Sequence, residues 1–361
     1  MSLDEKPTID RDMVAEYLSK LFNKKVRLTS FRELGTGILG VAYLMGLKVG
    51  GEEKRLVLKT LSTKGFGQDF SADRANTLLY ANSVYNKLPN HVRSYDVGAI
   101  MDDGSLISVG GAEEFFITMD FVEGAPYAEN LDRIKETGKL TGLDMEQVRI
   151  LAEYEAKIHS IKRIDPVLYV RRIRDLIGRG DCITGLIDTY PKNERTYAFT
   201  SDEEFEKIEE KCIAWRWRIK DKTHRLCQVH GDIHPFNILW QGPHKFILLD
   251  RSRGEWGEAA DDVSCLSFNY LFWSLMYCNS FCEPFKSLFE AFVEKYLDLT
   301  GDMELFKVIQ PFYAFRALVI AHPLFYPNIS VENRRRIFDF MNAVLDVEEF
   351  DYREVSSYIK G

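Results

Sequence analysis

The chain has 361 residues, of which 45% are apolar and 28% charged, and its formal net charge is −8. A chain of this length favours two domains, and its apolar content excludes a disordered protein. Because an acidic protein lacks the basic surface of a nucleic-acid binder, we expect no nucleic-acid partner.

The termini and the cysteines favour a cytoplasmic protein. Residues 1–10 are polar and contain no apolar signal-peptide core. The most apolar stretch, 263–285, is interrupted by polar side chains, so we interpret it as a buried helix and expect no membrane partner. The six cysteines are thinly spread and form no Cys-x-x-Cys pair, which predicts reduced thiols and neither a zinc site nor disulfides.

The first third of the chain is predicted to be rich in strands. Gly50-Gly51 separates two alternating segments and is typical of a β-hairpin turn. Helices are predicted over 12–22 and over 71–88, the second with Ser71 as its cap. Period-two alternation predicts strands over 25–34, 41–49, 54–61 and 114–122.

The hydrophobic period changes from two to about 3.6 after Pro126, and helical patterns then dominate to the end of the chain. This change predicts an α+β protein of two lobes. We expect a small β-rich lobe over 1–119, a hinge over 120–125 and a larger, mainly helical lobe over 126–361.

The strongest chemical signal is His230-Gly231-Asp232, followed by Asn237 and, after an apolar strand, by Asp250. Phosphoryl transfer needs a carboxylate that orients the attacking hydroxyl and oxygen ligands that hold Mg²⁺. Asp232 suits the first task, and Asn237 and Asp250 suit the second. A hairpin formed by 238–239 and 246–249 would bring Asn237 and Asp250 close together.

A glycine-rich segment, Gly35-Thr-Gly37-Ile-Leu-Gly40, lies between two predicted strands. Glycines let a backbone approach phosphates closely. A dinucleotide-binding fold would require a helix after Gly40. The strand-like residues that follow favour a kinase-type flap instead, and a plain hairpin turn is the alternative.

Lys59 ends the apolar run Leu56-Val57-Leu58. Strand alternation would bury Leu56 and Leu58 and place Lys59 on the other face. A lysine in such a place can pair with phosphates. The alternative is that Lys59 is simply solvated. The order of glycine loop, lysine, Asp232 and Asp250 along the chain favours phosphate binding.

These motifs resemble the aminoglycoside phosphotransferase and choline kinase family, relatives of the protein kinases. The resemblance extends over about 28–345 and is strongest in 230–239 and 248–264. It implies a two-lobed protein-kinase-like fold with the nucleotide held between the lobes.

The resemblance also assigns roles, position by position. It implies that Asp232 is the catalytic aspartate, that Asn237 and Asp250 are magnesium ligands, and that Lys59 binds phosphate together with the loop of Gly35, Gly37 and Gly40. It further implies that Met119 lies behind the adenine, that the backbone of Asp120 to Val122 is the adenine-binding hinge, and that His230 and Asp262 brace the catalytic loop.

The chain departs from the family pattern at several places. Position 236 is Phe, where relatives often have Gly. Residues 65–90 contain no Glu to pair with Lys59, so Asp73 is the candidate acid. Asp250 is not followed by Phe-Gly, and no Ala-Pro-Glu occurs downstream, which disfavours an ordinary protein kinase.

The sequence therefore predicts a phosphotransferase that uses ATP (or GTP) and Mg²⁺ to phosphorylate a hydroxyl of a small molecule. A protein kinase and a regulatory pseudokinase are the alternatives. The resemblance and the acidic chain favour a neutral or cationic acceptor, although Arg251 and Arg253 could equally hold an anionic one or simply be solvated. The sequence names neither the acceptor nor the oligomeric state.

Overall fold

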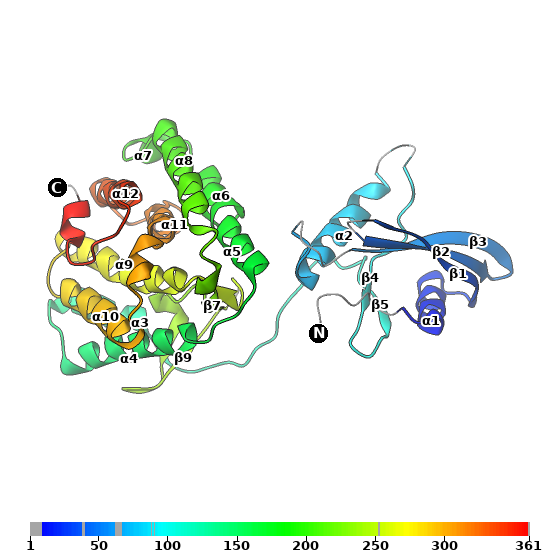
Figure 1. Ribbon diagram of the computed structural model, residues 1–361, viewed down its shortest axis with the longest axis horizontal. Coiled ribbons are helices and arrows are strands. Elements are labelled where there is room, and N and C mark those ends of the chain that lie inside the picture. Colours follow the sequence, from blue (N-terminus) through cyan, green and yellow to red (C-terminus); the bar gives the residue numbers. More distant parts are fainter. Residues whose placement is uncertain are drawn as a thin grey trace. The chain divides into compact units, whose positions relative to one another are not determined.

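The chain divides into two compact units, Met1–Met119 and Asp120–Gly361, each with a hydrophobic core of its own (Figure 1). The small unit carries an antiparallel sheet and the large unit is mainly helical, which confirms the expected α+β class. A hinge over 120–125 stays a prediction. The computed structural model describes residues 9–37, 40–61, 67–87, 89, 91–251 and 253–359.

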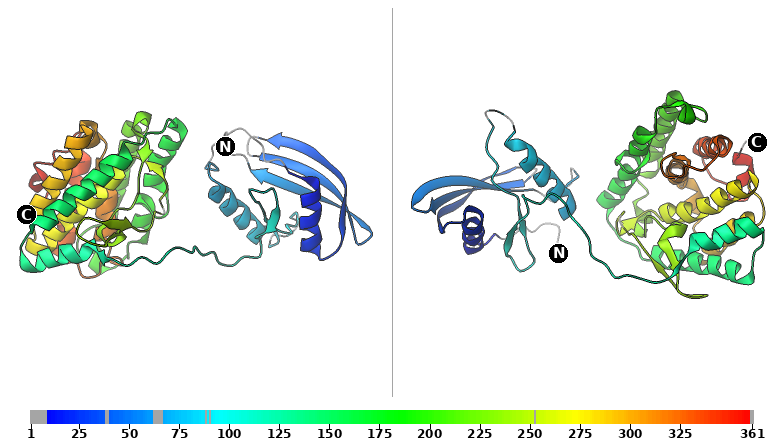
Figure 2. Two further views of the ribbon diagram at one scale, coloured as in Figure 1. Left: turned by 90° about the horizontal axis from the view of Figure 1, so that it is seen from below. Right: turned by 180° about the vertical axis from the view of Figure 1, so that it is seen from behind.

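The small unit is built on three antiparallel strands in the order β1-β2-β3. Gly50 and Gly51 turn the chain between β2 and β3 with φ angles of +58° and +99°, as the predicted hairpin requires. Helix α1 lies against the sheet (Figure 2), and its Val14 and Leu18 share a hydrophobic core with strand residues such as Met45. The elements of this unit are α1 (Arg11–Phe22), β1 (Val26–Gly37), β2 (Gly40–Val49), β3 (Glu52–Leu61), α2 (Ser71–Tyr85), β4 (Gly98–Ile100) and β5 (Leu106–Ser108).

The segment 114–122 has irregular backbone, so the strand expected there was wrong. An isolated extended segment becomes a strand only when a neighbour pairs with its N–H and C=O groups. Among the described residues, no strand pairs with it. Its alternating sequence therefore reflects side-chain composition and not a place in a sheet.

Helix α9 (Ala259–Cys278) is the central element of the large unit, and it is buried on nearly every side. Helices α3, α10 and α11 pack directly on it, and α4 lies along α10 (Figure 1). The other helices are α3 (Tyr127–Thr137), α4 (Gly142–His159), α5 (Pro166–Gly178), α6 (Ile183–Thr189), α7 (Glu194–Tyr197), α8 (Asp202–Ile219), α10 (Phe285–Thr300), α11 (Gln310–Ala321) and α12 (Val331–Asp346). None of the helices in the described ranges is long and apolar enough to cross a membrane.

Short strands and single 3₁₀ turns position the loops at one end of α9. Strand β8 pairs with β6 and β9, and β7 pairs with β10. These elements are η1 (Thr223–Arg225), β6 (Ala125–Pro126), β7 (Cys227–Gln228), η2 (Pro235–Asn237), β8 (Ile238–Trp240), β9 (Phe246–Leu248) and β10 (Trp256–Gly257). Two further 3₁₀ turns, η3 (Met303–Lys307) and η4 (Val355–Tyr358), lie later in the chain.

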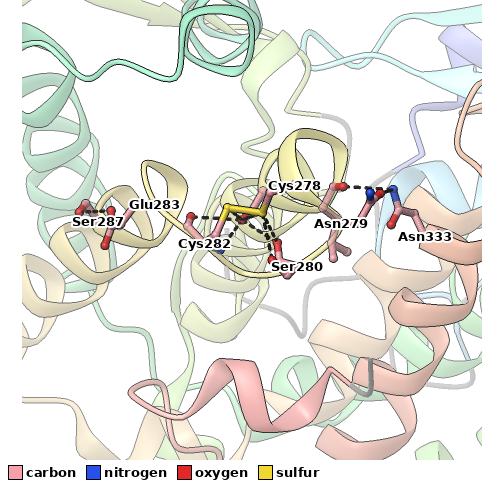
Figure 3. The surroundings of a disulfide bond; sticks show 9 residues. Cys278, Asn279, Ser280, Cys282, Glu283, Ser287 and Asn333 are labelled. Atoms are coloured by element: carbon pink, nitrogen blue, oxygen red, sulfur yellow. Dashed lines mark hydrogen bonds between the residues drawn. A yellow bond between two sulfur atoms is a disulfide. The ribbon is translucent and has the colours of Figure 1, made fainter.

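Cys278 and Cys282 form a disulfide at the C-terminal end of α9 (Figure 3), so the prediction of reduced thiols was wrong for this pair. Asn279 ends the helix in the left-handed region, with φ of 55°, and turns the chain back on itself. The hydroxyl of Ser274 accepts a hydrogen bond of 2.8 Å from the backbone N of Cys282 and thereby holds the turn. The other four cysteines are buried free thiols.

Candidate active site

Asp232 lies in the loop between β7 and η2, and Asp262 holds the backbone of that loop. Asp262 is in the first turn of α9, fully buried, and accepts hydrogen bonds from the backbone N of His230 at 2.7 Å and of Gly231 at 2.6 Å. Gly231 has φ of +88°, a conformation that favours glycine. The turn into Asp232 is therefore tied to the start of the central helix.

A buried histidine supports Asp262 from the other side. His159 Nε2 lies 3.1 Å from Asp262 Oδ2, and His159 Nδ1 lies 2.9 Å from the hydroxyl of Tyr296. Burial alone would raise the pKa of Asp262, but the hydrogen bond and charge of His159 and the two loop N–H groups hold it below its ordinary value. The His159 side chain therefore bridges α4, α9 and α10.

Arg316 of α11 holds the Asp232 loop through hydrogen bonds. Its Nη1 donates to Asp232 Oδ1 at 2.7 Å, and its Nη2 donates to the carbonyl oxygen of Gly231 at 3.0 Å and to Asp261 Oδ1 at 2.6 Å. The Arg316 side chain is 5% exposed, so these charge-assisted bonds are shielded from water. One guanidinium thus fixes both the carboxylate of Asp232 and the backbone before it.

The surroundings of Asp232 keep its carboxylate ionised. Burial would raise its pKa, but the charges of Arg316, Arg253 and His234, and the hydrogen bond from Arg316, hold the pKa below its ordinary value. Arg316 occupies Oδ1, whereas the described residues bring only His234 Nε2 toward Oδ2, at 3.9 Å. No hydrogen bond reaches Oδ2 from the described residues, so Oδ2 is the oxygen available to accept a proton.

The β8–β9 hairpin brings the neighbourhoods of Asn237 and Asp250 together. Ile238 pairs with Leu248, and the backbone N of Leu249 donates to the carbonyl oxygen of Asn237 at 2.9 Å. Asp250 follows directly, with φ of 53° in the left-handed region. The side-chain amide of Asn237 donates to the Asp232 carbonyl oxygen at 3.0 Å, and no described residue donates a hydrogen bond to its Oδ1.

These two side chains suit a magnesium ion that is shared with a phosphate ligand. Mg²⁺ prefers oxygen donors and in phosphate-binding sites takes only one or two carboxylates from the protein. Asn237 and Asp250 offer an amide oxygen and a carboxylate. Over the part of the chain that the structure describes, no group of three or more His, Cys, Asp or Glu side chains could hold a metal without such help.

The predicted glycine motif lies at the β1–β2 turn of the small unit. Gly37 ends β1, Gly40 begins β2, and these two residues pair across the strands, while Ile38 and Leu39 lie outside the described residues. A side chain at Gly40 would meet the carbonyl oxygen of Thr60 at 2.0 Å, so this glycine is needed for the approach of β2 and β3. Around Gly35 there is open space.

Lys59 lies on β3 opposite Ala42 and is exposed, on the face away from Leu56 and Leu58, as strand alternation predicts. Asp73 lies in the first turn of α2, where its carboxylate accepts a hydrogen bond of 2.8 Å from the backbone N of Phe70. The prediction that Ser71 caps this helix was wrong, because Ser71 is the first helical residue and the cap position is Phe70. The pairing of Lys59 with Asp73 stays a prediction.

The predicted hinge residues lie where the two compact units meet in the chain. Met119 is the last residue of the small unit and Asp120 is the first of the large one. Asp120 and Val122 have irregular backbone. Adenine binding by these residues stays a prediction.

Sequence reasoning missed Arg316, although a signal was present. Arg316 is the one charged residue in the helix Gln310–Ala321, among Phe312, Phe315 and aliphatic side chains. A charge inside a helix that is apolar all round must be buried, and a buried charge requires a partner. The partner itself could not be read from the sequence, because Asp232 precedes Arg316 by 84 residues.

Comparisons with known proteins place small-molecule kinases among the chain's structural neighbours. Searches of the sequence against protein-family models and against curated proteins find no match. Among solved structures, an amicoumacin kinase in complex with AMP-PNP, Ca²⁺ and its ligand is 14% identical, with 96% of this chain and 97% of that chain covered and a TM-score of 0.40. A Plasmodium vivax ethanolamine kinase is 12% identical, with 92% and 80% covered and a TM-score of 0.36.

A spectinomycin phosphotransferase in complex with ADP and spectinomycin is 13% identical, with 97% and 98% of the two chains covered and a TM-score of 0.33. These are the kinds of protein that the sequence motifs resemble. At such identities and TM-scores, the likeness does not identify the nucleotide, the metal or the acceptor of this chain.

Proposed function

We propose that this protein is a phosphotransferase that moves the γ-phosphoryl group of ATP (or GTP) to a hydroxyl group of a small molecule. Asp232 accepts the hydroxyl proton on Oδ2 while the hydroxyl oxygen forms its bond to the γ-phosphorus. The bond between that phosphorus and the β–γ bridging oxygen breaks, and the nucleoside diphosphate leaves. This chemistry needs positioned charges more than covalent intermediates.

The observation that carries this proposal is the state of Asp232. Its carboxylate is ionised, held through Oδ1 by the buried Arg316, and without a hydrogen bond on Oδ2 from the described residues. A general base needs a fixed direction and an open oxygen within reach of the proton. Arg316 and Asp262 supply the first requirement from two different helices, α11 and α9.

Asn237 and Asp250 are the proposed ligands of Mg²⁺, which when bound neutralises charge that develops on the phosphates. In the small unit, Lys59 and the hairpin of Gly35 to Gly40 are proposed to bind those phosphates. These roles rest on the motifs and on the donor chemistry of the side chains. The nearby Asp262 has a bracing role and is not a proposed ligand.

Replacing Asp232 by Asn tests the proposed base. The variant should bind nucleotide nearly as well as the parent but lose about 10²–10⁴-fold in kcat, the usual contribution of a positioned base. Asp298→Asn, on the exposed side of α10, is the matched control. Equal kcat for Asp232→Asn and the parent would exclude this role.

Replacing Asp250 by Ala tests the proposed metal ligand. Calorimetry of ATP binding with and without Mg²⁺ should show that the parent gains affinity from the metal and that Asp250→Ala loses this gain. If Mg²⁺ still strengthens nucleotide binding in Asp250→Ala to the same extent, another residue is the ligand.

A further inference from the structure

A small cavity of about 20 Å³ lies beside the Asp232 loop, between α5, the residue Cys182, the segment that follows Asp250, and α11. It has room for roughly one water-sized group, so it fits the end of a ligand and not a ring. Six charged side chains line it, which are Arg172, Arg179, Arg253, Asp175, Glu258 and Asp261.

The three carboxylates of this cavity are already neutralised by arginines that do not line it. Each has such a partner within 3.2 Å: Asp175 pairs with Arg171 and Arg174, Glu258 with Arg225, and Asp261 with Arg316. Of the three lining arginines, Arg179 pairs with Asp181 at 3.1 Å, and Arg253 reaches only to 3.9 Å from Asp232 Oδ1, an oxygen that Arg316 already holds. Among the described residues, the positive charges of Arg172 and Arg253 are therefore the least compensated in the cavity.

Arg172 has no hydrogen bond or ion pair within the described ranges, although it is partly buried. Its Nη1 lies 3.4 Å from the place where a side chain on Gly254 would begin, so it rests against the backbone next to Arg253. Burial lowers the pKa of Arg172, and the charge of Arg179 lowers it further, against Asp261 and Asp175, which raise it. A guanidinium so placed would gain from an anion.

Arg253 extends this charge toward Asp232. Its guanidinium lies over the Phe315 ring, 4.6 Å from the centroid, and its Nε is 3.9 Å from Asp232 Oδ1. Its closest polar contact is weak, from Nη1 to the sulfur of Cys182 at 3.7 Å. Most of its donors are therefore available, within a short reach of the proposed base.

We propose that Arg172 and Arg253 form an oxyanion subsite that binds a carboxylate or phosphate group of the acceptor, while the acceptor's hydroxyl is presented to Asp232. Guanidinium groups match the planar geometry of such oxyanions and bind them through paired hydrogen bonds. The proposal rests on the phosphotransferase function and gives its acceptor a chemical class, an alcohol that carries an anionic group. The sequence and the resemblance had favoured a neutral or cationic acceptor.

The test is a transfer assay with matched acceptors. In one arm, short hydroxy acids are compared with their amides and with the corresponding diols, which tests for a carboxylate. In the other arm, sugar phosphates are compared with their parent sugars, which tests for a phosphate. We expect kcat/KM for the anionic member to exceed that of its neutral partner by at least about tenfold in one arm, the usual effect of one charge-assisted contact.

Arg172→Gln should reduce that preference to near unity, and Arg172→Lys should restore part of it. Arg149→Gln, an exposed arginine on α4 and away from the cavity, should keep the parent's preference. A preference for neutral or amine-bearing alcohols, or an anionic preference that persists in Arg172→Gln, would overturn the subsite and leave the phosphotransferase function standing.

Anion binding without turnover separates the two proposals. Inorganic phosphate or acetate, compared with chloride at equal ionic strength, should raise the Tm of the parent and of Arg149→Gln more than that of Arg172→Gln. Equal shifts in all three proteins would overturn the subsite. If no acceptor is phosphorylated, the proposed function fails, and this binding measurement still decides the subsite.

Discussion

Replacing Arg316 by Gln should lower both the stability and the activity of the large unit. The change removes the guanidinium group that donates hydrogen bonds to Asp232, to Asp261 and to the carbonyl oxygen of Gly231. The Arg316 side chain is 5% exposed and that of Asp232 18%, so the buried-pair magnitude applies with little discount for solvent. Losing one partner of such a pair costs about 3–5 kcal/mol.

That cost can be measured as a change in melting temperature. For a unit of this size, 1 kcal/mol corresponds to about 2–4 °C, so Arg316→Gln should lower the Tm by about 6–20 °C. Because the carboxylate of Asp232 loses its fixed direction, kcat should fall by about 10²-fold. Arg149→Gln removes the same charge from an exposed site and should change neither quantity.

The pH profile distinguishes positioning from plain loss of stability. Asp232 works as a base when it is ionised, and Arg316 lowers its pKa, so the acidic limb of kcat/KM should move to higher pH in Arg316→Gln. The stability that comes from the lowered pKa is present above the ordinary value and is lost as the pH falls through the folded value. If Arg316→Gln does not fold, Arg316→Lys serves instead, because it keeps the positive charge but not the paired guanidinium hydrogen bonds. It should shift the acidic limb of kcat/KM by less than Arg316→Gln would.

A normal Tm together with an unchanged acidic limb in either variant would refute this reasoning. Loss of Tm with an unchanged limb in a folded variant would mean that Arg316 only stabilises the fold. Thermal unfolding and a pH series of kcat/KM decide between these outcomes.

Further predictions concern the core, the small unit and the thiols. Burial raises the pKa of the Glu155 carboxyl well above 4.5, and neither of its oxygens has a partner among the described residues. Since the folded state keeps that proton to higher pH than the unfolded state does, the free energy of unfolding should fall as the pH rises above about 4.5. Glu155→Gln should be about 1–3 kcal/mol more stable than the parent at pH 7. Equal denaturant curves of the parent at pH 4 and pH 7 would contradict this prediction. Gly40→Ala should lower the Tm of the small unit because its methyl group would strike Thr60, whereas Gly35→Ala should not. Iodoacetamide should label no cysteine of the native protein before mild reduction and two, Cys278 and Cys282, after it, as counted by mass spectrometry.

The local parts of the fold and site could be predicted from the sequence. The Gly50-Gly51 hairpin and the hairpin that joins Asn237 to Asp250 follow from alternation and turn residues a few positions apart. The strand over 114–122 was wrong because alternation does not reveal whether a partner strand exists. The pairing of Arg316 with Asp232 and of His159 with Asp262 was missed because the partners are 84 and 103 residues apart in the chain. Hydrophobic periodicity and turn motifs relate only residues that are close in sequence.

The disulfide was missed for a different reason. A spacing of four residues matches no common cysteine motif, and the two cysteines meet only because Asn279 reverses the chain at the end of α9. The left-handed residue at a helix end is usually Gly and only sometimes Asn, so the sequence did not single out Asn279 as the point where the chain turns back.

The position of Asp261 and Asp262 in the first turn of α9 has a consequence for how this protein can evolve. The same helix is the centre of the core, so a substitution along its buried length that moves the helix by a fraction of an ångström also moves the acids that hold Asp232. A deep mutational scan should therefore find abundance and activity falling together along α9. In α8, from whose residues no hydrogen bond or ion pair to the described Asp232 loop is formed, the two should separate, with many variants that are scarce but fully active per molecule.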